Sequence, residues 1–508
     1  MRTIKLTLTQ DRTIIATAIP SMTDEFHSLD DIGWYGSAFL LTSCCFTLFL
    51  GRVYTFYSPK YVFISLIVLF EIGSAVCGAA PSSVAFIIGR AIQGAGAAGM
   101  MSGAMVLFVH TVPLAKRPMW MGSVGAVFGI SSVVGPLLGG ALTTNATWRW
   151  CFYLNLPLGA VVLVAVMFIL KPMEPFKKGL NTKEKLFQLD PLGSFFLLPC
   201  LVCLLLALQW GGSTLTWSNG RIIALLVLFA VLFLAFIAVQ VTTQKTATIP
   251  AAVIKNRSIL AGGFFVFSVA SSMMIMVYFI PIWFQAVKGV SAVQSGIRTI
   301  PMVLSLVLGT IISGIGTSKI GYYTQFAYAS AIIMPIGAGM ISMWEVDTGH
   351  AEWIGFQVLF GFALGLGMQQ ANMAAQTVLK RPDVPTGLAL MVFMQTLGGS
   401  IFISVGQNVL TSNLVKGITH LVADIDPAMI ANTGATELRD LVPAEQLPEV
   451  LEVYNSALRQ VFLIAVGMAA VSILGAVGLE WKTVKKNEKV AAKKGESKDV
   501  EKQTESTA

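Results

Sequence analysis

Arg90 and Gln93 are two polar side chains inside a long apolar stretch, residues 84–109. Residues three apart lie on one face of a helix, so the two side chains are neighbours. A charged side chain inside a membrane costs about 2.5–3.5 kcal/mol even on the lenient insertion scale, and such residues usually have a function. The pair therefore predicts a helix that lines a water-filled cavity. The alternative is that Arg90 extends to the outer membrane interface.

Polar side chains in the second half of the chain predict a substrate cavity. Neutral amides follow a Gly-rich helix and recur in the next helix, together with Phe, Tyr and Met. This mixture suits a large, mostly apolar ligand with several functional groups. The residues assigned to the cavity are Tyr278, Gln369, Gln370, Asn372 and Gln395. Hydrogen bonding between helices is the alternative role for the amides.

The sequence carries no motif for metal, nucleotide or redox chemistry. Its histidines are far apart, unlike the clusters of a membrane metalloenzyme; they are His27, His110, His350 and His420. The six cysteines lie in apolar stretches, which argues against a disulfide framework, and the spacing of Cys200 and Cys203 is incidental. A Walker A motif is absent from the sequence. We expect no metal, no other cofactor and no enzymatic activity.

The composition identifies the scaffold that must position these residues. Hydrophobic residues make up 55 % of the 508 residues and charged residues only 12 %. The charged share is about half of the roughly 25 % that is usual in soluble proteins. The chain is therefore predicted to be an all-α polytopic membrane protein. Its formal net charge of +8 is spread over short loops and the tail, so it does not indicate nucleic-acid binding.

Thirteen stretches are long and apolar enough to span a bilayer, which takes about 20 residues. They lie at 33–52, 61–80, 84–109, 119–143, 150–170, 190–209, 222–241, 259–284, 298–316, 323–344, 352–373, 386–410 and 457–479. Residues 1–22, which include Asp11, resemble the second half of one more span. We expect an incomplete first helix, explained by a misannotated start of the reading frame or by a damaged paralogue.

The loop charges predict the orientation of the chain. When the loops alternate across the membrane, Lys and Arg gather on one side and the acidic loops on the other, and the basic side is the cytoplasm. With fourteen crossings, both termini are expected in the cytoplasm. Asn145 opens a glycosylation sequon on the outer side. The polar tail at 481–508 is expected to be disordered.

A stripe of small residues marks the span at 119–143. Gly122, Gly125, Gly129, Ser132, Pro136 and Gly139 follow one another at steps of three or four, so they share one helix face. Small residues allow the backbone of another membrane helix to approach closely. A proline in a helix frees a backbone carbonyl and bends the helix. We expect a bent helix in close contact with a neighbour, and ordinary packing is the alternative.

Several motifs resemble those of the major facilitator superfamily, in particular the fourteen-span drug:proton antiporters that include fungal toxin and multidrug exporters. Residues 11–20 resemble the first-helix motif, and Gly89-Arg90 with Gln93-Gly94 resembles the fourth-helix motif. The antiporter motif is matched by Gly125, Gly129, Gly135, Pro136, Gly139 and Gly140, and the sixth-helix signature by Trp148, Arg149, Asn155 and Pro157. The resemblance covers essentially the whole chain.

The resemblance implies two six-helix bundles around a central cavity, with two extra helices between them. The expected divisions are 1–170 (first bundle), 171–245 (loop and inserted helices), 246–480 (second bundle, with an outer loop at 411–455) and 481–508 (tail). It also implies that Asp11, Arg90 and Gln93 take part in proton coupling and that the proton gradient replaces any cofactor. The antiporter motif would seal and hinge the two bundles as they rock.

We therefore predict proton-driven export of a small, largely apolar organic compound, such as a fungal secondary metabolite, toxin or drug. The expected setting is a monomer surrounded by lipid in the cell membrane, or else in the vacuolar membrane. A siderophore or vacuolar basic amino-acid transporter is one alternative; a non-transporting sensor or an inactive truncated paralogue is another. One residue departs from the family pattern: Thr55 stands where an acid is expected, so a charge-based cytoplasmic latch is weakened or built differently.

Overall fold

The computed structural model describes residues 22, 25–26, 31–177, 179, 181–212, 215–244, 246–421 and 446–485. Its first helices are α2 (Ile32–Phe56), α3 (Pro59–Ala79), α4 (Ser83–Thr111), α5 (Arg117–Asn145), α6 (Trp150–Tyr153) and α7 (Asn155–Ile169). We call these the N-terminal half. A short helix, α8 (Thr182–Gln188), leads to an inserted pair, α9 (Pro191–Trp210) and α10 (Gly220–Thr242).

The C-terminal half follows the short helix α11 (Ala251–Ile254). It comprises α12 (Arg257–Ala286), α13 (Ala292–Arg298), α14 (Ile300–Ile320), α15 (Thr324–Ile341), α16 (His350–Gly367), α17 (Gln370–Val378), α18 (Val384–Leu421) and α21 (Leu447–Gly478). Two single-turn 3₁₀ helices, η1 (Leu114–Lys116) and η2 (Arg381–Asp383), precede α5 and α18.

Local sequence explains many of the helix ends. Proline stands in the first turn of α3, α5, α9, α14 and α21. The N–H groups of a first turn have no partner within the helix, so proline, which has no N–H, is well accommodated there. Ser82 caps α4 by accepting a hydrogen bond from Ala85 N. Gly321, with a φ of 96°, ends α14 in the left-handed conformation that glycine adopts freely.

The thirteen predicted spans all coincide with helices. In the described part of the chain, 12 helices are long and apolar enough to cross a membrane. The remaining predicted span, at 119–143, coincides with α5, which has 29 residues, as many as α4. At 1.5 Å per residue, such a helix is about 43 Å long, more than the hydrocarbon core of a bilayer. The protein is therefore a multi-pass membrane protein.

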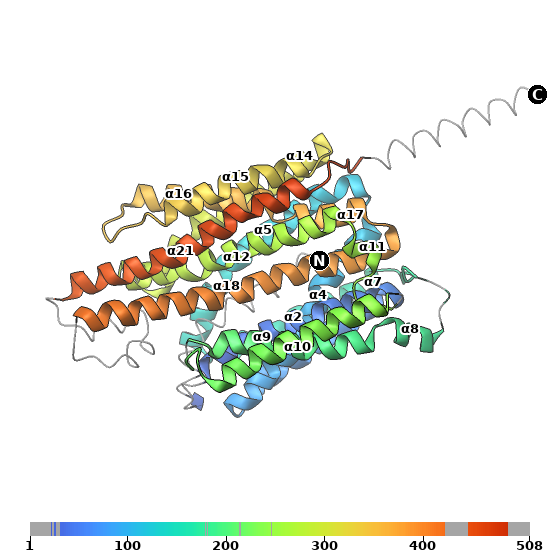
Figure 1. Ribbon diagram of the computed structural model, residues 1–508, viewed down its shortest axis with the longest axis horizontal. Helices are drawn as coiled ribbons and strands as arrows, with labels where there is room; N and C mark the ends of the chain where they lie inside the picture. Colours follow the sequence, from blue (N-terminus) through green and yellow to red (C-terminus); the bar gives the residue numbers. More distant parts are fainter. Residues whose placement is uncertain are drawn as a thin grey trace, which may run out of the picture.

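The helices form two groups that meet along two seams. Within the N-terminal half, α2 and α3 pack on α4; within the C-terminal half, α12 packs on α18 and α21, and α16 packs on α14 and α15. Between the halves, α5 packs on α14, and α2 packs on α18. Figure 1 shows α9 and α10 alongside α2 in the lower part of the view, and α14, α15, α16 and α21 in the upper part.

The loop expected at 411–455 is shorter than predicted. Helix α18 continues to Leu421 and α21 begins at Leu447, so helices cover both ends of the range. Leu410, Leu414 and Ile418 repeat at four-residue steps and are buried, as are Val450 and Tyr454 of α21. The two helices therefore extend their apolar contact beyond the predicted spans, because burying this surface stabilises the added turns. Residues 422–445 lie outside the described chain.

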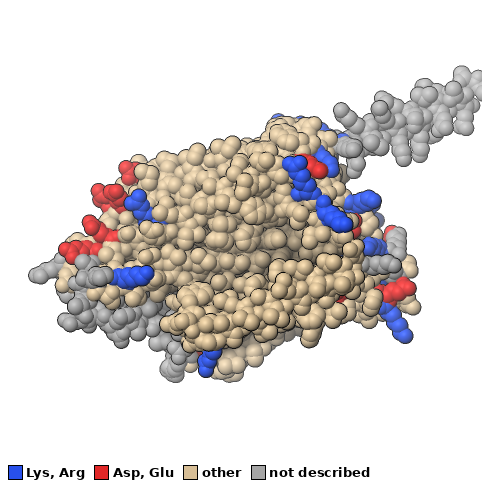
Figure 2. Space-filling view, in the orientation of Figure 1, with Lys and Arg blue, Asp and Glu red and all other residues tan. Residues whose placement is uncertain are grey.

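The charged side chains divide between the two ends of the molecule. Figure 2 shows most of the visible Lys and Arg at one end and most of the visible Asp and Glu at the other. We call the first the basic end; it includes Lys177, Lys255, Lys319, Lys380 and Arg381, which lie in connections between helices or at helix ends. The acidic end includes Glu345, Asp347, Glu352 and Glu449. This division matches the loop charges from which the orientation was predicted.

Candidate functional site

Arg90 lies in a buried network inside the N-terminal half. Only 1 % of its side chain is exposed. Its Nε donates to the backbone oxygen of Tyr35 at 3.0 Å, and its Nη1 donates to Oε1 of Gln93 at 2.6 Å. The guanidinium carbon lies 4.5 Å from the ring centre of Phe39. The ring faces and the two acceptors compensate for the loss of water around the charge.

The network continues from α4 to α3 and α7. Nε2 of Gln93 donates to Oγ of Ser74 at 2.9 Å, and Nδ2 of Asn155 donates to the same oxygen at 3.4 Å. Asn155, expected from the sixth-helix signature, therefore joins the residues of the fourth-helix motif. Arg90 and Gln93 are 1 % and 0 % exposed, so in this structure neither side chain faces an open, water-filled cavity of the kind that was predicted. Arg90 also does not extend to an exposed interface.

Trp148 and Arg149 hold the acidic end of the N-terminal half together. Nε1 of Trp148 donates to Oε2 of Glu25 at 2.6 Å, and Nη2 of Arg149 pairs with Oε1 at 2.6 Å. Arg149 also donates to the backbone oxygens of Gly78 and Ala80, at the end of α3. The hydrogen bond from Trp148, followed by that from Arg149, lowers the pKa of Glu25.

Several predicted residues of α5, Ser132 among them, and one of the first segment give no side-chain geometry. Asp11 lies outside the described residues. Gly129, Pro136, Gly140 and Asn145 are described only as part of the backbone of α5. Gly135 and Gly139 of the same helix are buried. Pro157 lies exposed in the first turn of α7, where its missing N–H leaves no bond unmade.

The glycine stripe of α5 meets α14 near the basic end. A Cβ atom on Gly125 would lie 2.3 Å from Cγ2 of Thr310, and one on Gly122 would lie 2.9 Å from the backbone oxygen of Thr310. From the other side, a Cβ on Gly314 would lie 2.6 Å from the backbone oxygen of Pro118. Real Cβ contacts are not this short, so the helices approach this closely because these positions lack side chains.

The second seam, between α2 and α18, is equally close at the basic end. A Cβ on Gly51 would lie 2.2 Å from Cβ of Ala389. A hydrogen bond of 3.2 Å from Nη1 of Arg117 to Oε1 of Gln376 also links the two halves there. Gly51 and Gln376 were not predicted to be contacts between the halves. The signals were a small residue inside the span at 33–52 and an amide three residues after the span at 352–373.

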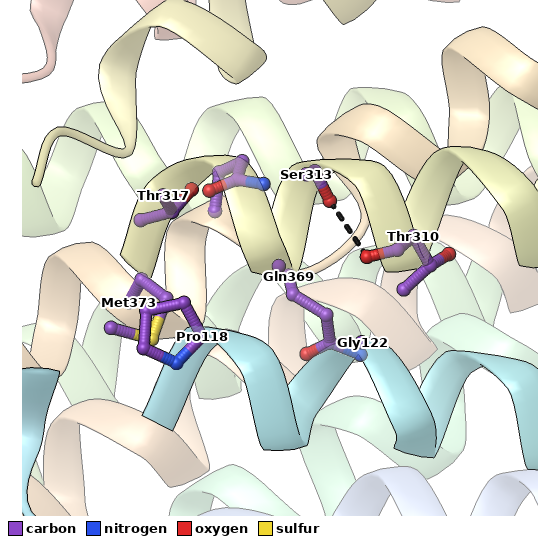
Figure 3. Close-up of a pocket in the computed structure, with 9 residues that line it drawn as sticks. Pro118, Gly122, Thr310, Ser313, Thr317, Gln369 and Met373 are labelled. Carbon is purple, nitrogen blue, oxygen red and sulfur yellow. Dashed lines mark hydrogen bonds between the residues drawn. The ribbon is translucent and has the colours of Figure 1, made fainter. Parts of the chain in front are cut away.

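Gln369 and Gln370 lie at the α5–α14 seam. Figure 3 shows Gln369 pointing between α14, with Thr310, Ser313 and Thr317, and the first turns of α5. The pocket has a volume of about 10 Å³, close to the smallest space that holds one water molecule. In the described structure, Oε1 of Gln370 and Oγ1 of Thr317 are buried without hydrogen-bond partners. The pocket suits a bridging water and is too small for an organic substrate.

A break in the helix between α16 and α17 determines where the side chains of Gln369, Gln370 and Asn372 lie. The expected span at 352–373 breaks at Met368 and Gln369. Nε2 of Gln370 donates to the backbone oxygen of Leu366 at 2.7 Å, and Nδ2 of Asn372 donates to Oε1 of Gln369 at 3.3 Å. The side chains thus bond to one another and to carbonyls near the break. Irregular backbone at membrane depth needs such internal partners.

Tyr278 lies apart from the three amides Gln369, Gln370 and Asn372. The side chain of Tyr278 is 48 % exposed, on the face of α12 whose Met274 packs on Gly399 of α18. Gln395 of α18 is partly buried. The residue Ala371 packs near Gly262, and Tyr278 is 16 residues further along α12, a distance of about 24 Å. Tyr278 is therefore too far from these amides to line one small site with them.

Comparisons with known proteins agree with this architecture. A family model described as Major Facilitator Superfamily matches residues 5–403. The chain is 50 % identical over 476 residues to the MFS-type efflux pump MFS1 of Arthroderma benhamiae, covering 94 % of this chain and 89 % of that protein. It is 49 % identical over 479 residues to the efflux pump aflT of Aspergillus parasiticus, covering 94 % and 93 %. The rubrofusarin-specific efflux pump aurT of Gibberella zeae is 48 % identical over 478 residues, covering 94 % and 88 %.

Two solved structures share the fold at low sequence identity. The human organic anion transporter MFSD10 aligns with a TM-score of 0.57 and 13 % identity, covering 92 % of this chain and 98 % of that chain. A bacterial homologue of the lysosomal transporter Spinster aligns with a TM-score of 0.56 and 16 % identity, covering 94 % and 96 %. The helical halves, the matched family model and the relatives at about 50 % identity lead to one conclusion: the chain belongs to the major facilitator superfamily.

Proposed function

We propose that the protein exports a small, largely apolar organic compound, such as a fungal secondary metabolite, in exchange for protons. Relatives of 48–50 % identity that carry the name efflux pump support this function. The structural observation that most supports this function is the close approach of the two halves at glycine residues, along the α5–α14 seam and the α2–α18 seam. Rocking of two halves about such contacts opens a central site to one side and then to the other.

The charges at the two ends of the molecule support an orientation in the membrane. The basic end faces the cytoplasm by the positive-inside bias, which also places the C-terminal tail there. Gly51 with Ala389 and Gly125 with Thr310 are in close contact at that end, so in this proposal the two halves are closed toward the cytoplasm. We place the protein in the plasma membrane as a monomer, with the vacuolar membrane as the alternative site.

Protons supply the energy for export in this proposal. One charge moving through 100 mV yields about 2.3 kcal/mol, and each unit of pH gradient adds about 1.4 kcal/mol. Together these support a concentration ratio of a few hundred per proton. Arg90 and Gln93 are the described residues to which we assign coupling, because a buried charge held by exchangeable hydrogen bonds responds to a nearby protonation change.

A vesicle assay tests the proposal. Purified protein is reconstituted with a pH gradient, and the movement of a panel of secondary metabolites that includes rubrofusarin is measured. We expect gradient-dependent transport of at least one compound, and a protonophore should abolish it. The variant Arg90→Ala should be inactive. Arg221→Ala, which removes an exposed arginine at the start of α10, is the matched control and should transport normally. Transport that persists with the protonophore would refute proton coupling.

A further inference from the structure

The inserted pair α9–α10 is attached to α2 at three levels. At the basic end, Nη2 of Arg52 donates to the backbone oxygen of Gln188 at 2.7 Å, just before α9. In the middle, Sγ of Cys45 lies 3.9 Å from the backbone oxygen of Leu198. At the acidic end, the rings of Trp34 and Trp210 meet edge to face, with centres 6.0 Å apart. Helix α9 therefore runs along α2, and α10 packs on α9 (Figure 1).

The same pair also reaches the C-terminal half, through α18. At the acidic end, a Cβ on Gly212 would lie 2.1 Å from Oδ1 of Asn408. Helix α9 thus lies over the groove in which α2 and α18 meet, and it touches both halves. When the halves rock, α9 has to separate from one of them or slide along it.

Asp190 ties the two ends of the pair together at the basic end. It is 2 % exposed, and it is the one non-glycine residue of the described chain with a positive φ, 54°. Its Oδ1 accepts the N–H of Gly193 at 2.8 Å and so caps α9. Its Oδ2 accepts three bonds: from Nε2 of Gln240, at the end of α10, and from the N–H and Oγ1 of Thr248.

Arg52 connects this cluster to the N-terminal half. Besides Gln188, its Nη2 reaches the backbone oxygen of Thr246 at 3.5 Å, so it holds both connections of the inserted pair. Two carboxylates attract the guanidinium group of Arg52: Asp190 and, from the turn before α18, Asp383. No carboxylate stands at Thr55, where the family pattern has one. Asp190, from a different part of the chain, supplies a carboxylate near Arg52.

We propose that Asp190 is a positioning residue that makes the inserted pair one unit and, with Arg52, attaches that unit to the N-terminal half. The pair then moves with α2 while α9 slides along α18. The joint to the C-terminal half falls between Thr248 and the start of α12 at Arg257. The inserted helices thereby cover the α2–α18 seam in both states of the transporter.

Spin labels on three exposed side chains test which half the pair follows. Val231 marks α10, Ile72 marks α3 of the N-terminal half, and Ile312 marks α14 of the C-terminal half. The six native cysteines are buried, so a thiol label that enters detergent micelles reacts with the introduced, lipid-facing cysteines before reconstitution. The distances between pairs of labels are measured in lipid nanodiscs, in protein that has the native Gly51 and in the variant Gly51→Ala. The added methyl group of the variant prevents close contact with Ala389.

The three distances should separate the alternatives. We expect the Ile72–Ile312 and Val231–Ile312 distances to shift in Gly51→Ala and the Val231–Ile72 distance to stay the same. A shift of Val231–Ile72 with a constant Val231–Ile312 distance would overturn the proposal, because the pair would then follow the C-terminal half.

The variant Asp190→Asn tests the residue itself. Asparagine tolerates a positive φ and keeps the oxygen that caps Gly193, but its amide nitrogen faces the three donors that Oδ2 accepted. The Val231–Ile72 distance distribution should broaden. Asn219→Ala, which removes the cap at the opposite end of α10, is the control and should leave the distribution unchanged. An unchanged distribution in Asp190→Asn would show that Asp190 does not position the pair.

Discussion

The backbone of Gly51 and the methyl group of Ala389 are in contact across the seam between α2 and α18, where a Cβ on Gly51 would lie 2.2 Å from that of Ala389. The contact joins the two halves at the basic end. Because any side chain larger than hydrogen would force the helices apart, the closed state depends on this glycine.

We expect Gly51→Ala to shift the protein away from closure at the basic end. Overpacking a close contact costs about 1–3 kcal/mol, which corresponds to about a 5- to 150-fold shift of the equilibrium. Transport should fall. A cysteine placed at Thr386, which is buried beside the seam, should react faster with a polar thiol reagent.

Two variants distinguish this effect from a general loss of stability. Gly36→Ala changes the same helix at a position with no atom within 4 Å and should behave as the unmodified protein. Gly51→Ala combined with Ala389→Gly restores the space and should restore transport. Failure of the double variant to recover would show that the seam contact does not limit closure.

Gly125→Ala should disturb the α5–α14 seam. The added methyl group would lie 2.3 Å from Cγ2 of Thr310, so the expected cost is again about 1–3 kcal/mol. Thr310→Ala removes that methyl group and should recover part of the transport rate. Gly339→Ala on α15, which has no neighbour within 4 Å, is the control. Equal transport by Gly125→Ala and Gly339→Ala would mean that the stripe has no role in gating.

Arg90→Lys should retain a positive charge and lose proton-driven transport. In Arg90, Nε bonds to the backbone oxygen of Tyr35 and Nη1 bonds to Oε1 of Gln93. Lysine has a single nitrogen at the end of its side chain and cannot reproduce both bonds in this planar geometry. An acceptor left without a donor costs about 1–3 kcal/mol, so thermal stability should fall moderately. The measurement compares gradient-driven uptake with substrate exchange at equal pH; coupling by Arg90 predicts that only the first is lost.

Glu25 should stabilise the acidic end above, but not below, its pKa. Because its folded pKa is lowered by Trp148 and Arg149, its contribution is complete above the unfolded value of about 4.3 and is lost as the pH falls through the folded value. We expect Glu25→Gln to have a lower unfolding temperature at pH 7 and to approach the unmodified protein near pH 3. The group is half exposed, so the difference should be small. The same difference at both pH values would contradict the ion pair.

The sequence by itself determined the membrane class, the thirteen described spans and the face of α5 that approaches a neighbour. These features depend on composition and on a helical period, both of which are local. Gly122 and Gly125 could be identified as close-contact positions because small residues at this spacing share one face. The motifs around Arg90 and Trp148 could be recognised for the same reason: each motif is short and continuous.

Only the tertiary structure decided which distant residues meet. It placed Thr310 opposite Gly125, Ala389 opposite Gly51, and Thr248 and Gln240 around Asp190. It also placed Gln370 in a small pocket at a seam and Tyr278 elsewhere on α12. Such pairings depend on how whole helices pack, and apolar surfaces that all favour burial carry little information about their partners. The physical reason is that packing is specific in shape, whereas hydropathy is not.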